Sequence, residues 1–162
     1  MIVEYQITDV RSQTLFDAMG GAETFFRIAR LMHDRMSHDD LLGDKFTKAD
    51  ATHVPHLGMW LCEVFGGPKL YSVTLGDIGL MLARHAGQDI AEGERSRFVA
   101  IANQAVADCA PADAHEAVAA ISRYFAWGSH IAVTNSCPGH VANPAAGVPT
   151  WDWDSGLDSP AA

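Results

Sequence analysis

The segment from Gly66 to His85 carries the side chains with the most specific chemistry. It begins with a Gly-Gly-Pro helix breaker, continues through Lys69 and Tyr71, and closes an apolar helical pattern with Arg84 and His85. The iron of haem takes an imidazole ligand, and carboxylates such as its propionates bind cations and hydroxyl donors. The segment therefore predicts a buried iron cofactor that bears acid groups, for which haem is the leading candidate.

Other histidines and cysteines offer alternatives to that interpretation. His53 and His56 have the spacing of two ligands on one helix face, and His33 could complete a zinc site, but structural zinc usually has four Cys or His ligands. Cys137 and His140 resemble a nucleophile and its base, but a turn is the simpler explanation of Cys-Pro-Gly-His. The sequence has no phosphate-binding glycine loop, serine-hydrolase elbow or dinucleotide fingerprint.

Helical spacing of apolar residues predicts the elements that position these groups. After an extended lead over 1–11, the expected helices cover 14–18, 22–36, 39–47 (a short helix or turn), 52–65, 74–85, 92–109 and 113–127. Glycine pairs at 20–21 and 66–67 end helices, since glycine is unfavourable within them. No stretch shows the sustained alternation of a strand, so the predicted fold is all-α.

The sequence changes character after residue 127. Residues 128–162 are rich in Pro, Gly and Ala, so we expect a helical domain over 1–127 and an irregular C-terminal extension over 128–162. Trp151 and Trp153 could pack this extension on the body of the chain, cover a cofactor edge or bridge two copies. Disorder is the alternative.

Composition excludes several classes of function. The 162 residues include 20 acidic and 11 basic side chains, for a net charge of -9, which argues against nucleic-acid binding and against anionic membrane surfaces. No apolar run is long enough to span a bilayer and no secretory signal is visible, so a cytoplasmic location is expected. The spacing of Cys62, Cys109 and Cys137 fits no disulfide framework, and the first two are expected in the core.

The order of these features resembles the truncated haemoglobins, most closely their second group. The resemblance covers about residues 15–127, and it rests on Gly20-Gly21, Phe46, the Gly66–Ser72 run, Arg84-His85 and Ile90-x-x-x-Glu94-Arg95. It implies a two-over-two helical sandwich that binds haem b. It also implies that His85 is the proximal ligand to the iron and that Phe46 stacks on the haem edge.

The same resemblance implies the rest of the haem site. Lys69, Tyr71 and Arg84 are candidate partners of the haem propionates. The apolar residues expected to line the cavity are Leu57, Trp60, Leu61, Leu82, Ile90, Phe98 and Phe125.

The distal side departs from the family pattern. His33 stands where the family usually has a tyrosine, and Phe98 stands where the second group usually has a tryptophan that donates an N–H to the bound ligand. Phe98 cannot donate, so His33 and His53 are the expected distal residues, with His56 nearer the haem edge or solvent. A distal histidine can stabilise bound oxygen, bind the iron itself, or move a proton to and from peroxide.

Two activities follow from this resemblance. The first is binding of a diatomic ligand (O2, NO or CO) at the iron. The alternative is haem-dependent redox catalysis through the distal histidines, as a peroxidase or an NO-detoxifying oxidoreductase. A reductase and a second copy of the chain are candidate partners. A helical interaction module without haem is the remaining interpretation.

Overall fold

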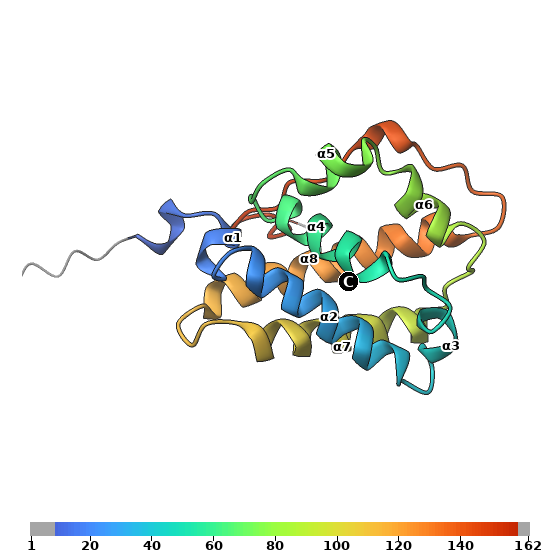
Figure 1. Cartoon of the computed structure of the whole chain (residues 1–162), viewed down its shortest axis with the longest axis horizontal. Helices are drawn as coiled ribbons and strands as arrows, with labels where there is room; N and C mark the ends of the chain where they lie inside the picture. The colour runs from blue at the N-terminus through green and yellow to red at the C-terminus, as the bar shows by residue number, and fades with distance from the viewer. Residues whose placement is uncertain (1–8, 159–162) are drawn as a thin grey trace, which may run out of the picture.

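The computed structural model describes residues 9–158 and forms an all-helical body (Figure 1). Its α-helices are α1 (Leu15–Ala18), α2 (Ala22–Ser37), α3 (Gly43–Phe46), α4 (His53–Val64), α5 (Leu70–Leu75), α6 (Gly79–His85), α7 (Glu92–Cys109) and α8 (His115–Ser136), with 3-10 turns at Val10–Ser12 and Pro144–Ala146. No strand occurs within 9–158, so the all-α prediction is confirmed. Most of the predicted N-terminal lead, residues 1–8, lies outside the described residues.

The long helices pack in two pairs. α2 packs against both α4 and α7, and α7 packs along α8, so that the α2–α4 pair faces the α7–α8 pair. The apolar positions of α2 explain this contact, because Phe25, Ile28 and Met32 recur at helical spacing and are fully buried. Phe25 stacks on Phe65 at the end of α4 with 5.4 Å between ring centroids. These helices form the sandwich that the sequence predicts.

The last helix is longer than predicted. The expected end at residue 127 is wrong, because α8 continues across Gly128 to Ser136. Ser129 and Ser136 are buried there, and their hydroxyls donate to the carbonyls of Ala126 and Val133 within the same helix. The predicted domain boundary at 127 falls inside this helix.

The predicted single helix over 74–85 is also wrong, because two helices occupy its place. α5 ends at Gly76, which has a φ of +82° that favours glycine, and α6 begins at Gly79. The Asp77 carboxylate accepts the Gly79 N–H at 2.8 Å. Leu75 and Ile78 lie on either side of this break at helical spacing, and the sequence therefore predicted one continuous helix.

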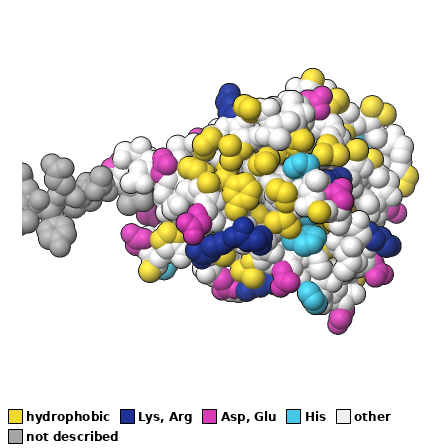
Figure 2. Space-filling view, viewed as in Figure 1, with side chains coloured by type: hydrophobic (Ala, Val, Ile, Leu, Met, Phe, Trp, Pro, Cys, Tyr) yellow, Lys and Arg dark blue, Asp and Glu magenta, His cyan; other side chains and the backbone are white. Residues whose placement is uncertain are grey.

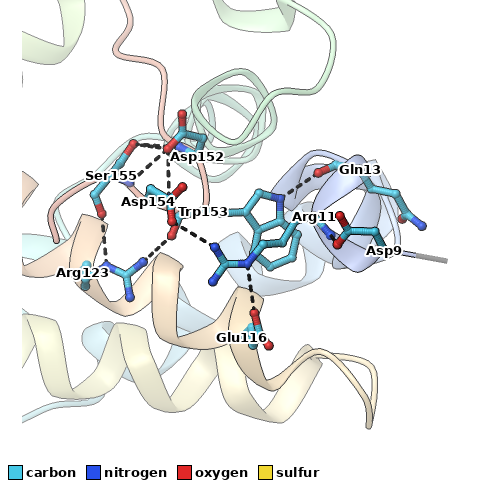
Figure 3. Close-up of polar contacts among 9 residues, drawn as sticks. All are labelled: Asp9, Arg11, Gln13, Glu116, Arg123, Asp152, Trp153, Asp154 and Ser155. Atoms are coloured by element: carbon cyan, nitrogen blue, oxygen red, sulfur yellow. Dashed lines mark hydrogen bonds and ion pairs between the residues drawn. The ribbon is translucent and has the colours of Figure 1, made fainter. Parts of the chain in front are cut away.

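The C-terminal segment docks on its own chain. From the end of α8 it runs past α6 and α5 and returns toward α1 (Figure 1), where Trp151 and Trp153 are buried. Arg123 of α8 donates to the carbonyls of Trp153 (2.6 Å) and Ser155 (3.1 Å), and Trp153 Nε1 donates to the Gln13 carbonyl (Figure 3). Of the roles considered for these tryptophans, packing on the body is the one that the structure shows.

The face of the molecule in Figure 2 has an apolar centre beside a row of cations. Apolar side chains gather in the middle of the face over α4, and Lys and Arg side chains lie beside them along α2 (Figure 2). No helix within residues 9–158 combines the length and apolar character that a membrane span requires. Cys62 and Cys109 are buried free thiols and Cys137 is exposed, as the sequence predicts for the first two.

Gly58 allows α2 and α4 to approach closely. A Cβ at this buried position would overlap the ring of Phe26 on α2, so we expect Gly58→Ala to destabilise the fold by about 1–3 kcal/mol. Gly93→Ala is the matched control, because a Cβ there meets nothing within 4 Å. Urea unfolding would measure both variants, and equal stability of the two would contradict the close packing described here.

Candidate cofactor site

One cavity of about 390 Å³ lies between the helices that carry the predicted iron ligands. Its lining residues come from α3, α4, α6, α7, α8 and the adjoining loops. They are Leu42, Lys45, Phe46, Lys48, Ala49, Asp50, His53, Ala83, Arg84, His85, Gln88, Ile90, Glu94, Arg95, Phe98, Ser129 and Ala132. Six predicted site residues therefore meet at one cavity: Phe46, His53, Arg84, His85, Ile90 and Phe98.

His85 is the last residue of α6, and the helix itself orients its ring. Its Nδ1 lies 2.8 Å from the Met81 carbonyl, which can only accept, so Nδ1 carries the proton and Nε2 keeps its lone pair. Burial lowers the pKa of His85, while the bond to Met81 acts in the opposite direction. The ring is therefore a neutral imidazole with a free Nε2, which is the form that binds a metal.

His53 and His33 form a pair beside the same cavity. His53 opens α4, His33 lies on α2, and their Nδ1 atoms are 3.0 Å apart. One of these atoms must donate and the other accept, so the tautomers of the two rings are linked. Phe46 packs edge-on against both rings, with centroids 5.9 Å from His53 and 6.4 Å from His33. The pair is thus held in an apolar corner.

The environment keeps His53 uncharged. Burial lowers its pKa from 6.5 to about 4, and electrostatic interactions with His33 and Arg84 contribute to the decrease. In the unfolded chain His53 has the ordinary pKa of 6.5 and takes up a proton before the folded chain does. The free energy of unfolding is therefore highest above pH 6.5 and falls as the pH decreases toward 4.

We therefore expect the haem-free protein to lose stability between pH 6.5 and 4, and the His53→Leu variant to lose on the order of 2 kcal/mol less, allowing for solvent screening. The measurement is urea unfolding across this pH range. His140→Leu, at an exposed position of the segment after α8, is the control and should keep the wild-type slope. A wild-type slope in His53→Leu would contradict the assignment.

Cations gather around the cavity although the chain is acidic. Lys45, Lys48, Arg84 and Arg95 line it, which is four of the 11 Lys and Arg residues. Lys45 pairs with Glu94 at 2.9 Å and holds the pKa of that carboxyl below its usual value. The sequence prediction of propionate partners named Lys69, Tyr71 and Arg84, and of these three only Arg84 is a cation that lines the cavity. The Glu94-Arg95 motif of the family resemblance was a signal for Arg95.

The part of α8 beyond residue 127 completes the cavity wall. Ser129 and Ala132 line the cavity, and Arg95 donates to the Ser129 hydroxyl at 3.1 Å. Ser136 holds the loop after His85, because its Oγ accepts the Ile90 N–H and its carbonyl accepts the Asp89 N–H. Sequence reasoning missed these contacts, since it placed residues 128–136 in an irregular tail.

The remaining predicted residues are not among those that line this cavity. They are His33, Leu57, Trp60, Leu61, Lys69, Leu82, Tyr71 and Phe125. Trp60 donates to the Tyr124 hydroxyl at 2.7 Å and packs on Tyr71, while Lys69 is exposed at the start of α5. Phe125 lies directly behind the cavity wall, 6.2 Å from Phe98 between centroids. Their assignment to the site stays a prediction.

The lining suits haem better than it suits zinc. Within residues 9–158 no group of three His, Cys, Asp or Glu side chains converges on one point, so His33, His53 and His56 do not form the alternative zinc site. The cavity instead combines the free Nε2 of His85 with apolar surfaces of Phe46 and Phe98 and a border of cations. A flat apolar group with carboxylates and an iron atom matches that donor set.

Comparison with known proteins matches the fold of this chain to globins. A family model described as bacterial-like globin matches residues 14–127. The haemoglobin of Chloroflexus aurantiacus is 26% identical over 74% of this chain and 97% of its own, with a TM-score of 0.65. That of Thermobifida fusca is 28% identical over 75% and 97%, with a TM-score of 0.64. The group II truncated haemoglobin of Bacillus anthracis is 20% identical over 80% and 96%, with a TM-score of 0.65, a likeness of fold alone.

Proposed function

This chain belongs to the bacterial-like globin family, and on that basis we propose that its cavity binds haem b with His85 as the proximal ligand to the iron. One observation carries the proposal: the Met81 carbonyl fixes the His85 tautomer, so that Nε2 is free at a cavity lined by Phe46 and Phe98. When bound, haem supplies an iron coordination position for O2, NO or CO. The family membership itself implies a haem-binding globin; haem b and the ligand assignments are the proposal.

In this proposal the cavity-lining cations Arg84, Lys45 and Lys48 bind the haem propionates and so orient the haem. Arg84 lines the cavity and donates to the Thr52 hydroxyl at 2.9 Å, so its guanidinium is held between α6 and the start of α4. Lys45 and Lys48 line the same cavity. The four lining cations outnumber the two lining carboxylates, Asp50 and Glu94, and the excess of positive charge favours propionates there. Lys69 and Tyr71 stay predicted as further partners of the propionates.

His53 supplies the distal hydrogen bond. If His33 Nδ1 donates to His53 Nδ1, the proton of His53 lies on Nε2, where it can donate to a partly negative oxygen ligand. In the opposite tautomer His53 Nε2 has a lone pair, which can bind the iron. His33 therefore acts by setting the tautomer of His53.

Redox catalysis with peroxide is the second candidate function, and the His33–His53 pair is the observation that favours it. An uncharged His53 can take a proton from bound peroxide and return it, as general acid–base catalysis requires. Rapid reaction of the ferric protein with hydrogen peroxide, slowed in His53→Leu, would support this function. A rate no greater than that of free haem would reject it. An NO-detoxifying reaction, a reductase, a homodimer and a cytoplasmic location stay predictions.

Titration of the haem-free protein with hemin tests the proposed function. We expect a Soret band that grows until one hemin is bound per chain and then stops. The haem-free form should be recovered by extraction, so that the same sample serves as its own reference. Growth of the band without an end point would indicate non-specific adsorption and would contradict a built site.

A further inference from the structure

A line of aromatic side chains begins at the surface of α8. Trp127 is exposed, and its ring lies 5.2 Å from Trp151 and 6.0 Å from Tyr124 between centroids. Trp151 is buried and lies 5.6 Å from Tyr124. Trp151 belongs to the docked C-terminal segment, so this segment supplies one ring of the line.

The line continues inward to the helix that carries His85. Trp60 Nε1 donates to the Tyr124 hydroxyl at 2.7 Å, and the Trp60 ring packs edge-on against Tyr71 with 5.0 Å between centroids. Burial raises the pKa of the Tyr71 phenol, and hydrogen bonding to the Met81 backbone acts in the opposite direction. The Met81 carbonyl in turn holds His85 Nδ1. Ring contacts and hydrogen bonds thus connect Trp127 to the candidate proximal histidine.

Every member of this line is a tryptophan or a tyrosine, the two side chains that lose an electron most readily among those that do not bind metals. Electron transfer between neighbouring rings is fast because their edges are in contact. The fourth tryptophan, Trp153, is buried like Trp151 but makes none of these ring contacts. Its Nε1 donates to the Gln13 carbonyl instead (Figure 3). Trp153 is therefore a tryptophan outside the line.

We propose that this line conducts electrons from Trp127 to the haem when hydrogen peroxide is the oxidant, which makes Trp127 a surface site of one-electron oxidation. The inference rests on the haem binding proposed above. Reduction of one peroxide to two waters takes two electrons and two protons, and Trp127 supplies them in two successive one-electron steps through Tyr124, Trp60 and Tyr71. In each step Trp127 releases its Nε1 proton to water and is left as a neutral indolyl radical. An organic reductant that gives up a hydrogen atom at the surface restores the indole after each step, so one peroxide oxidises two reductant molecules.

The presence of a proton acceptor decides which side chain holds the radical. Burial raises the pKa of Tyr124 to about 12, and among the described residues no acceptor lies within hydrogen-bond distance of its hydroxyl proton. A phenol that cannot release its proton is hard to oxidise, so Tyr124 bridges Trp127 and Trp60 without itself holding the radical. Trp127 is exposed to water, which can accept the indole proton.

The test uses haem-loaded full-length protein mixed with hydrogen peroxide in the absence of a reducing substrate. We expect an indolyl radical by electron paramagnetic resonance and added oxygen on the Trp127 peptide by mass spectrometry. Trp60→Phe keeps an aromatic ring but removes the hydrogen bond and the readily oxidised indole, so both signals should be lost from protein that hemin titration shows to be fully loaded. Trp153→Phe is the matched control and should keep both signals.

Three outcomes would overturn the inference. Oxidation confined to cavity-lining residues would place the electron source there, and undiminished Trp127 oxidation in Trp60→Phe would show attack from solution. If Trp60→Phe does not fold, Trp127→Phe, at an exposed position, takes its place, and an unchanged indolyl signal in that variant would also overturn it. Failure of the underlying function is distinguishable, because hemin titration would then give no saturable Soret band in the unmodified protein.

Discussion

Replacing His85 with glycine is expected to abolish the five- or six-coordinate iron spectrum of the haem-loaded protein. The change removes the only imidazole that the structure shows with its Nδ1 fixed by a backbone carbonyl and its Nε2 free at the cavity. Glycine is well tolerated at the end of a helix, so α6 should persist. The absorption spectrum of the ferric protein measures the effect, and added imidazole should restore the wild-type bands by filling the vacated space.

His140→Gly is the control for this prediction, since His140 is exposed in the segment after α8. Its spectrum should match that of the unmodified protein. An unchanged iron spectrum in His85→Gly, without imidazole, would show that another residue ligates the iron and would remove His85 from the proximal position.

The second large effect is expected at His53. Loss of its hydrogen bond to bound oxygen should raise the oxygen dissociation rate of His53→Leu about 10- to 100-fold, because a charge-assisted bond contributes roughly 1.5–3 kcal/mol and each tenfold change corresponds to about 1.4 kcal/mol. Stopped-flow displacement of oxygen by CO from the reduced protein measures this rate. His53 is placed for the role because it lines the cavity and pairs with His33.

His56→Leu is the matched control on the same helix. His56 lies one turn from His53 and is not among the cavity-lining residues, so its replacement should change the rate little. Equal acceleration in the two variants would indicate a general loosening of α4. No acceleration in His53→Leu would show that the distal donor lies elsewhere, with His33 as the next residue to replace.

The helical framework was largely predictable because apolar periodicity reports burial directly. α2, α4 and α7 begin and end close to the predicted residues, and the glycine pairs mark real helix ends. The extension of α8 was not predictable, because Gly128 and the small residues after it are typical of a tail. They remain helical since Ser129 and Ser136 are buried against the cavity wall and the loop after His85, which are tertiary contacts.

The sequence predicted several of the candidate residues that the structure brings to one cavity. Phe46, His53 and His85 reach the same cavity from three helices. Lys45 could not be found this way, because its position at the cavity depends on how α3 lies against α7, where it meets Glu94. The docking of the C-terminal segment likewise depends on Arg123 meeting backbone carbonyls, which no sequence spacing indicates.

The most direct test of the central claim is the visible absorption spectrum of the haem-loaded protein after reduction with dithionite, before and after addition of CO. We predict a Soret band that shifts on CO binding, as expected for an accessible haem iron on a histidine. Low-spin bands before CO would indicate that His33 or His53 occupies the sixth position, and high-spin bands that it is open. A Soret band that CO leaves unchanged, or no band at all after titration with hemin, would contradict the assignment of this cavity as a ligand-binding haem site.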